Sequence, residues 1–325
     1  MKFTNSSTKI ETLVESISLS IMQEKLRVGD NLPSINEASA HYKVSRDTVF
    51  KAYNELKKRS LIDSKPTKGY YVTGSVNRVL LLLDNYSAFK QNLYHQFAVN
   101  LGENYKVDLI FHQYNEHLFE TILNDSIGKY SMYVIMNFSN DKLSDTLKKI
   151  PANKLLLLDF GNFEKSQFSY ICQDFDVALY DCLKEGLNLL KKYKKLSFIF
   201  PEDLRHPISS INYFKRFCAD FGFESEVLRH QSDWKGIEKS CAYLCIDTDD
   251  MVRIIKEANA SSLEIAVDVG IIAYNDDPVL EVIKNGITAI SVDFGLMGAM
   301  AANFVRTKVQ IQEILPTHFV SRASI

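Results

Sequence analysis

The sequence lacks most of what enzymes, membrane proteins and secreted proteins require. It has no G-x-x-x-x-G-K-[ST], G-x-S-x-G or H-E-x-x-H motif, and no G-x-G-x-x-G after a strand. Its longest apolar runs, such as VLLLLD from Val79, are far too short to span a bilayer. The opening MKFTNSSTKIETL has no apolar segment typical of a signal peptide. We therefore expect a cytoplasmic protein that is not an enzyme and makes no membrane contact.

Cysteine is scarce as well, with five residues scattered through 325. Cys241 and Cys245 are four apart, but no second Cys or His pair accompanies them, so the spacing does not predict zinc. The seven histidines are dispersed in the same way. An odd number of cysteines in a large chain without an export signal is typical of reduced thiols. The sequence predicts no disulfide framework, no metal and no cofactor.

Charge is unevenly distributed along the chain. Residues 1–77 hold 12 Lys and Arg against 8 Asp and Glu, whereas the remainder holds 26 against 32. Within residues 43–68 there are eight basic and three acidic residues. A local basic patch on a mildly acidic protein indicates an anionic partner for that end alone. A solvated surface is the alternative interpretation of the same pattern.

The basic end has the pattern of a helix-turn-helix with a β-hairpin beside it. Residues 8–26 predict an amphipathic helix, and Ser34 with Glu37 forms a capping box for a short helix at 35–42. After a three-residue break, Ser45 caps another helix. The buried face of that helix is Val49, Ala52, Tyr53 and Leu56. Strands at 61–64 and 70–73 flank a basic turn, which completes a winged helix.

The stretch GDNLPSINEASAHYKVSRDTVFKAYNELKKRSLI, followed by GYYV, resembles the winged-helix domain of GntR-type transcription regulators. Four signals match in order: G-D-x-L-P-S, V-S-R-x-T-V, A-Y-x-x-L and K-G-Y-Y-V. The resemblance implies that the first turns of the second helix enter the major groove and that the wing tip approaches the minor groove. The DNA-contacting residues that it implies are Ser34, Ser45, Arg46, Thr48, Lys51, Thr67, Lys68 and Gly69.

Alternatives remain for several of these positions. Ser34 and Ser45 would be needed as helix caps in any case, and Arg46 could pair with Asp47 or Glu55. The chain also departs from its relatives, since Asn36 stands where many of them have Arg and Phe50 where some have a second Arg. The operator sequence is therefore not transferable from relatives.

Residues 78–325 alternate strands and helices, after a head at 1–74 and a linker at 75–77. Apolar runs predict strands at 78–84, 106–112, 132–138, 154–160, 196–200, 225–229, 242–247, 267–274 and 286–293. Helices are expected at 88–103, 115–128, 140–149, 174–192, 208–221, 249–260 and 294–306. This alternation is typical of doubly wound α/β sheets. We expect two lobes with a cleft between them and a ligand beyond the carboxyl ends of the strands.

The stretch VGIIAYNDDPVLEVIKNGITAISVDFGLMGAMAANFV, with LPTHFVSRASI, is similar to LacI/GalR-type regulators. That resemblance implies a two-lobed, type I periplasmic-binding-protein-like effector domain, joined to a GntR head as in AraR-type proteins. The aminotransferase-like domain of some GntR proteins would need many more residues. The ligand-binding residues that the resemblance implies are Asp84, Asn85, Phe89, Asn137, Asp174, Arg205, His206, Thr248 and Asn275.

Each ligand position has a structural alternative as a strand-end turn or a helix cap. Asn275 stands where the family usually has a sugar-binding Asp, and Ser210 stands where relatives often have Arg. Arg205 and His206 lie near that position in the sequence and are expected to substitute. Planar Asp and Asn side chains suit adjacent sugar hydroxyls, and Phe89 suits the C–H face of a sugar ring.

The sequence thus predicts a homodimeric DNA-binding regulator that recognises a palindromic operator. The predicted effector is a small polar molecule, a monosaccharide. We expect the protein to repress transcription and the effector to relieve that repression. The alternative is a sugar-processing or sugar-binding protein with a vestigial DNA-binding head, for which the sequence offers no catalytic constellation.

Overall fold

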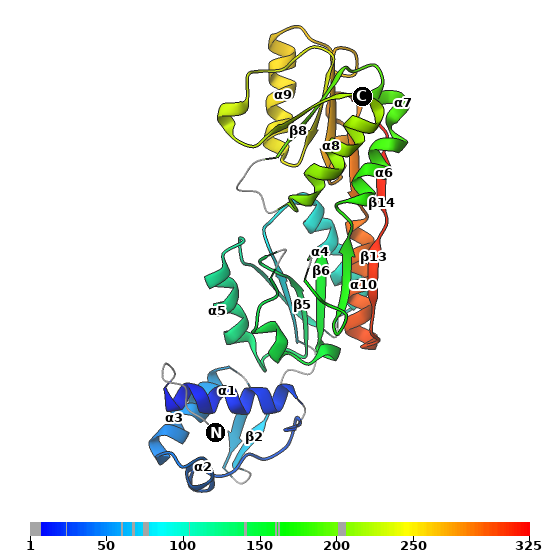
Figure 1. Cartoon of the computed structure of the whole chain (residues 1–325). Coiled ribbons are helices and arrows are strands. Elements are labelled where there is room, and N and C mark those ends of the chain that lie inside the picture. The colour runs from blue at the N-terminus through cyan, green and yellow to red at the C-terminus, as the bar shows by residue number, and fades with distance from the viewer. Residues whose placement is uncertain are drawn as a thin grey trace. The chain divides into compact units, whose positions relative to one another are not determined.

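The computed structural model describes residues 8–23, 25–59, 61–66, 69–73, 78–103, 105–139, 142–159, 161, 163–200 and 206–325 (Figure 1). The chain forms two compact units, which are described separately. The first contains residues 1–86, 98–170 and 300–312, and the second contains residues 87–97, 171–299 and 313–325. None of the described helices has the length and the apolar composition needed to cross a bilayer.

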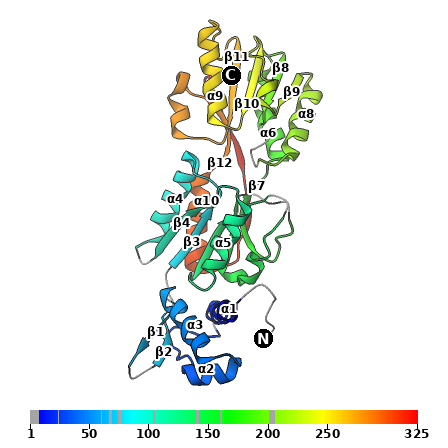
Figure 2. The same cartoon turned by 90° about the vertical axis from the view of Figure 1, so that its left-hand side faces the viewer.

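Residues 8–73, called the head from here on, belong to the first unit and form a winged helix. Its elements are α1 (Lys9–Met22), α2 (Ile35–Tyr42), α3 (Arg46–Lys58), β1 (Ile62–Lys65) and β2 (Gly69–Val72). The two strands pair antiparallel, with Ile62 opposite Val72 and Lys65 opposite Gly69 (Figure 2). Apolar residues from all five elements form one buried cluster. The three helices and the hairpin predicted from the sequence are confirmed, with bounds shifted by a few residues.

The first α/β sheet has the strand order β13-β7-β6-β5-β3-β4. Its strands are β3 (Arg78–Leu83), β4 (Lys106–Phe111), β5 (Met132–Met136), β6 (Leu155–Asp159), β7 (Ser169–Gln173) and β13 (Gln312–Leu315). The helices α4 (Ala88–Leu101) and α5 (Glu116–Ser126) lie between its first strands in the sequence. The pairs β3–β4, β3–β5 and β5–β6 are parallel. Every residue of β5 and β6 is buried, as their continuous apolar runs predict.

The second sheet has the order β14-β12-β11-β10-β8-β9. Its strands are β8 (Lys195–Ile199), β9 (Glu224–Leu228), β10 (Cys241–Cys245), β11 (Val269–Tyr274), β12 (Thr288–Val292) and β14 (Thr317–Val320). Its helices are α6 (Val177–Glu185), α7 (Leu187–Leu190), α8 (Ser209–Phe221) and α9 (Thr248–Ala260), whereas α10 (Phe294–Thr307), which follows β12, is divided between the two units. β8 to β12 are parallel, and β14 runs antiparallel to β12. The predicted doubly wound α/β architecture is therefore confirmed.

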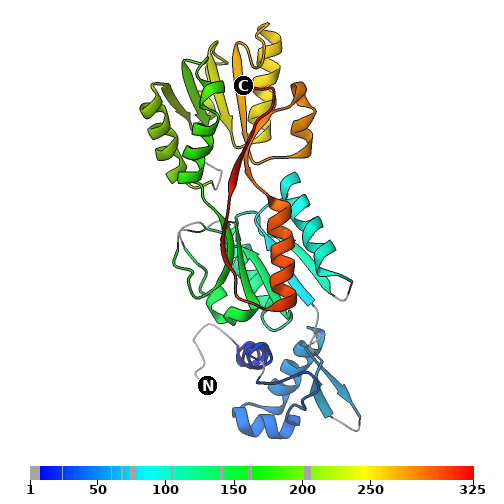
Figure 3. The ribbon, with the colours of Figure 1, turned by 90° about the vertical axis from the view of Figure 1, so that its right-hand side faces the viewer.

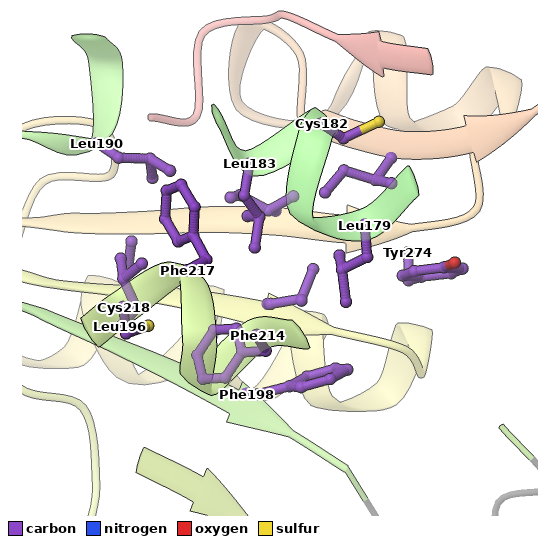
Figure 4. Packing of buried hydrophobic residues seen from close by; sticks show 14 of the residues in the cluster. Leu179, Cys182, Leu183, Leu190, Leu196, Phe198, Phe214, Phe217, Cys218 and Tyr274 are labelled. Carbon is purple, nitrogen blue, oxygen red and sulfur yellow. The ribbon is translucent and has the colours of Figure 1, made fainter. Parts of the chain in front are cut away.

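Two apolar clusters cover the two faces of the second sheet. One contains Phe198 of β8 with Phe214 and Phe217 of α8, and Figure 4 shows Phe198 beside Phe214, with Tyr274 at the edge of the group. The other packs α9 against the opposite face through Met251 and Ile254. All five cysteines are buried and none forms a disulfide, and Cys182 and Cys218 belong to the first cluster. Their role is therefore packing, as the sequence predicts.

The helix expected at 140–149 is not formed in the described part of that segment. Residues 142–146 are coil and turn, and only a 3-10 turn at Leu147–Lys149 follows. The Asn137 side chain donates to the carbonyls of Ser139 and Lys142, at 2.7 Å each, which holds the chain in a turn. Ser144 is buried and donates to Glu120. Side-chain hydrogen bonds to the backbone have outcompeted the helix here.

Helices α4 and α10 approach each other unusually closely through a glycine. A Cβ atom placed on Gly298 would lie 2.2 Å from the Leu93 carbonyl oxygen and 3.1 Å from the Phe97 nitrogen. Figure 3 shows α10 beside α4 along this contact. Because both neighbours are backbone atoms, no side-chain rotation can relieve the clash.

Replacing Gly298 by Ala is expected to lower the free energy of unfolding by about 1–3 kcal/mol, the range for forced overpacking of a tight contact. Urea denaturation followed by circular dichroism measures the change. Asn303→Ala, at an exposed position of the same helix, is the control and should change stability little. Equal stability of Gly298→Ala and the wild type would contradict the close contact.

Candidate nucleic-acid interface and effector site

The third helix of the head, α3, begins at a side-chain cap. Ser45 Oγ accepts a hydrogen bond from the Thr48 backbone nitrogen at 3.1 Å and lies 2.8 Å from Thr48 Oγ1. Ser34 does the same for α2, where Glu37 completes the capping box and accepts from the Ser34 nitrogen at 2.8 Å. These bonds lower the pKa of the Glu37 carboxyl. Ser34 and Ser45 therefore act as caps, and both are exposed, so capping does not prevent contact with a phosphate.

One buried tyrosine holds the parts of the head together. Tyr53 of α3 is fully buried, and its hydroxyl donates to the Pro33 carbonyl at 2.9 Å. Its ring makes an edge contact with Tyr70 of β2, with centroids 4.7 Å apart. Burial raises the pKa of Tyr53 well above its ordinary value, so the hydroxyl stays protonated and remains a donor. This residue fixes α3 against both the turn before α2 and the wing.

The exposed side of α3 carries a cation without an ion-pair partner among the described residues. Asp47 pairs with Lys51 at 2.8 Å, and Glu55 pairs with Arg59 at 3.0 Å. Both carboxylates that might have held Arg46 are thus engaged elsewhere, which disfavours the ion-pair alternative for Arg46. Arg46 is exposed in the first turn of the helix. Lys51 is exposed too but is engaged with Asp47.

The wing is described only in part. Gly69 begins β2 opposite Lys65 with φ at +72°, a left-handed conformation that glycine adopts without strain. Nothing lies within 4 Å of a Cβ placed there, so its backbone is open to a partner. Thr67 and Lys68, the predicted wing-tip contacts, lie outside the described residues.

In both α/β sheets the strand order reverses next to the first strand. β3 lies between β4 and β5 in the first sheet, and β8 lies between β9 and β10 in the second. In open parallel sheets, ligands bind beyond the carboxyl ends of the strands at such a reversal. The predicted residues Asp84 and Asn137 follow the first pair, β3 and β5, whereas His206 and Thr248 follow the second pair, β8 and β10. Topology thus places the carboxyl ends of β3 and β5 side by side, and those of β8 and β10 side by side.

At the first reversal, buried polar groups bind one another. Asp84 is 1% exposed and accepts from the Asn85 nitrogen at 2.6 Å and from the Tyr114 hydroxyl at 2.7 Å. Asn137 donates both amide hydrogens to backbone carbonyls, and its buried Oδ1 has no hydrogen-bond partner within the described part of the chain. Tyr114 was missed from the sequence because it lies in a turn after β4, away from any motif. The arrangement leaves one buried acceptor, Asn137 Oδ1, unsatisfied.

In the second unit, His206 lies in an aromatic cluster. Its ring centroid is 5.0 Å from Phe175, 5.5 Å from Phe200 and 4.6 Å from Tyr274, with edge contacts throughout. Burial lowers the pKa of His206 to about 3, so the imidazole is neutral in the cell. Its Nε2 has no hydrogen-bond partner among the residues that the structure describes. The cluster brings together residues that follow β7 and β8 with the last residue of β11.

Two further unpaired acceptors belong to residues adjacent to this cluster. Asp176 follows Phe175, Asn275 follows Tyr274, and the Oδ1 atom of each is buried without a hydrogen-bond partner in the structure. Asp174, by contrast, accepts from the Asp176 and Ala178 nitrogens at 2.8 and 3.3 Å. Asp174 therefore acts as a cap at the start of α6. Asp176 was missed because two aspartates before a helix are more often caps than ligands.

The other predicted ligand residues lie in varied surroundings. Phe89 packs on Phe294 with centroids 4.6 Å apart, and Thr248 is exposed in the first turn of α9. Ser210 is fully buried and donates to the Pro207 carbonyl at 2.8 Å, so it supports the start of α8. Arg205 lies outside the described residues.

The loop that carries Asn275 is tied to the C-terminal tail. The two terminal nitrogens of the Arg322 guanidinium donate to the two Asp276 carboxylate oxygens, at 2.7 and 2.8 Å. Arg322 also donates to the Ile287 carbonyl at 2.9 Å. A bidentate fork of this kind is both stronger and more directional than a single ion pair. Asn275 itself has φ at +71°, so its neighbours impose its conformation.

Comparison with known proteins now identifies the head. Residues 9–72 match the family described as bacterial regulatory proteins, gntR family. Residues 9–72 form a GntR-type helix-turn-helix domain. The chain is also 46% identical over 71 residues to the uncharacterized HTH-type transcriptional regulator YcxD of Bacillus subtilis. That match covers 22% of this chain and spans only 14% of the length of YcxD.

Beyond the GntR-type head, the fold is that of LacI-type regulators. The trehalose repressor of Escherichia coli superposes with a TM-score of 0.63 at 13% identity, over 75% of this chain and 99% of that one. A LacI family regulator of Lactobacillus casei with bound glucose gives 0.62 at 13%, over 77% and 100%. The regulator CelR in complex with cellobiose gives 0.60 at 14%, over 90% and 100%. At these identities the likeness shows the fold alone.

The neutral state of His206 makes stability depend on pH. The unfolded chain binds a proton at this residue below its ordinary pKa of 6.5, whereas the folded protein does so only near 3. The contribution of His206 to the free energy of unfolding is therefore fully present above pH 6.5. It falls as the pH drops toward 3, by up to ~1.4 kcal/mol per pH unit.

His206→Phe is expected to reduce this loss, because phenylalanine keeps the aromatic cluster and cannot titrate. Thermal unfolding at pH 5.5 and pH 7.5 measures the difference for each variant. His117→Gln, at an exposed position, is the control and should retain the wild-type dependence. Identical pH dependence in His206→Phe and the wild type would show that His206 is not the group responsible.

Proposed function

We propose that the protein is a transcription regulator that binds an operator through its GntR-type head and responds to a small polar effector. The observation that carries the first part is the exposed first turn of α3, where Arg46 has no ion-pair partner among the described residues. A recognition helix enters the major groove through its first turns, where an arginine reads guanine with two hydrogen bonds. The capped N-terminus of α3 adds backbone N–H groups suited to phosphate.

The second part rests on unsatisfied acceptors at the strand ends. Asp176, His206 and Asn275, all in the second unit, each leave a buried polar atom without a hydrogen-bond partner among the described residues. Each such atom costs about 1–3 kcal/mol unless a donor reaches it. A ligand rich in hydroxyl groups supplies such donors, and aromatic rings beside them suit its C–H faces. Solved structures of the same fold contain bound glucose, bound sucrose or cellobiose, which supports a neutral sugar, a monosaccharide in our proposal.

Further proposals follow from the same class of regulator. A homodimer would place two heads on a palindromic operator, since protein and operator symmetry correspond. An effector that binds one arrangement of the protein more tightly than another would change operator affinity. We propose repression relieved by the effector, and a cytoplasmic location follows from action on DNA. We also propose that residues 1–74 form the DNA-binding domain, residues 75–77 the linker and residues 78–325 the effector domain.

An enzyme with a vestigial head is the competing function. Among the described residues, no group of three or more His, Cys, Asp and Glu side chains is placed to hold a metal ion. The strand-end residues described above are acceptors and caps, and no nucleophile pairs with a base among them. Ligand turnover on incubation with the purified protein would favour that alternative over regulation.

Arg46→Ala is expected to weaken operator binding by about 1–3 kcal/mol, because it removes a direct base contact. Gel-shift titration of the full chain against a duplex selected from its own promoter region measures the change. Arg59→Ala is the matched control, since Arg59 pairs with Glu55 at the far end of the same helix. Unchanged affinity in Arg46→Ala would remove Arg46 from base recognition.

A panel of neutral monosaccharides and disaccharides tests the effector. A bound sugar at 100 times its Kd should stabilise the protein by ~2.7 kcal/mol, seen as a shift in Tm. Asp176→Ala and Asn275→Ala should each lose at least about tenfold in affinity, as expected for a lost buried hydrogen bond. Asp249→Asn, an exposed acid in the first turn of α9, should bind as the wild type does. Equal affinity in all four proteins would place the ligand elsewhere.

A further inference from the structure

Phe50 is an exposed aromatic residue on the helix proposed to enter DNA. Its exposed fraction is 47%, although the apolar side of α3 is already filled by Val49, Ala52, Tyr53 and Leu56. Within the described part of the chain, no aromatic ring pairs with Phe50. The core of the head therefore does not require an aromatic residue at this position.

The position of Phe50 follows from helix geometry. Residues four apart on an α-helix lie on the same face, about 6 Å from each other. Phe50 is thus one turn beyond Arg46, and the ion pair of Asp47 with Lys51 lies next to it on the exposed side. Any surface that receives the Arg46 side chain in the first turn also meets Phe50 in the second.

The chemistry of the major groove offers one apolar group to such a side chain. Each base pair presents hydrogen-bonding groups there, and only thymine adds a methyl group, at C5. A phenyl ring forms no conventional hydrogen bond and would leave the polar edge of a guanine or cytosine without a partner. Contact with the thymine methyl instead removes apolar surface of both groups from water.

We propose that Phe50 contacts the C5-methyl group of a thymine and so specifies a T·A pair in each operator half-site, beside the base pair reached by Arg46. The inference rests on the proposed DNA-binding function and adds a specificity-determining residue to it. It concerns this chain in particular, because the residue at this position is phenylalanine rather than a side chain that reads hydrogen-bonding groups.

Replacement of thymine by deoxyuridine tests the proposal, because it removes only the methyl group. Operators are first selected from random duplexes with the full-length protein, and each thymine is then replaced in turn. Fluorescence anisotropy gives the Kd of every duplex. One replacement per half-site should weaken wild-type binding about fourfold, equivalent to ~0.8 kcal/mol for one buried carbon group.

Phe50→Ala should bind the thymine and deoxyuridine operators equally, whereas Phe50→Leu should keep part of the preference for thymine. Val28→Ala is the matched control, since Val28 is 55% exposed elsewhere in the head and should leave the methyl effect intact. Because Phe50 is exposed, these variants are expected to unfold at the wild-type temperature, which circular dichroism verifies.

Three results would overturn the proposal. The first is wild-type binding that no deoxyuridine replacement weakens, and the second is a methyl effect that persists in Phe50→Ala. The third is a change in the mass of the DNA-free protein in Phe50→Ala, which would assign Phe50 to contact with a second copy. Failure to select any duplex would overturn the regulator proposal as well, whereas a tightly bound operator without a methyl effect would overturn only the role of Phe50.

Discussion

The buried face of α3 is the constraint on which the head depends. Val49, Ala52, Tyr53 and Leu56 follow the 3.6-residue period, so packing them against α1, α2 and the hairpin fixes the rotation of the helix about its axis. Tyr53 adds a directional bond, because its hydroxyl has one acceptor, the Pro33 carbonyl. Once the rotation is fixed, the exposed positions are fixed too. The surface that the head presents is therefore a consequence of its core.

The α/β part follows a comparable logic at its strand ends. A parallel sheet buries its strands on both faces, so its polar side chains are concentrated where the strands stop. At those ends some carboxylates become caps, as Asp174 does, and some become fork partners, as Asp276 does with Arg322. Only some buried acceptor atoms at the strand ends then lack a hydrogen-bond partner among the described residues. The buried Oδ1 atoms of Asp176 and Asn275 are left over after the loops have met their own requirements.

Sequence patterns predicted the elements whose cause is local. Apolar runs located β3, β5 and β6, and the serine caps located the starts of α2 and α3, because these signals depend on residues within one turn or one strand. The 140–149 segment was predicted wrongly, because hydrogen bonds from Asn137 and Ser144 override its helical pattern. The strands β7, β13 and β14 were not predicted, since each is only four or five residues long and lacks a long continuous apolar run. Among the sites, Asp174 was named rather than Asp176, because which of two nearby aspartates caps the helix depends on backbone geometry alone.

The number of unpaired acceptors also limits how far an effector can shift the equilibrium between two arrangements of the protein. Moving a two-state equilibrium from 1:99 to 99:1 requires a ligand to favour one state by ~5.5 kcal/mol. Asp176, His206 and Asn275 lie in one unit, and donors to their three buried atoms at about 1–3 kcal/mol each reach that size. This energy drives regulation only if the bonds form in one arrangement of the protein and not in the other. The Arg322–Asp276 fork matters for that reason, because it restrains the backbone beside Asn275 and so sets where its acceptor meets a ligand.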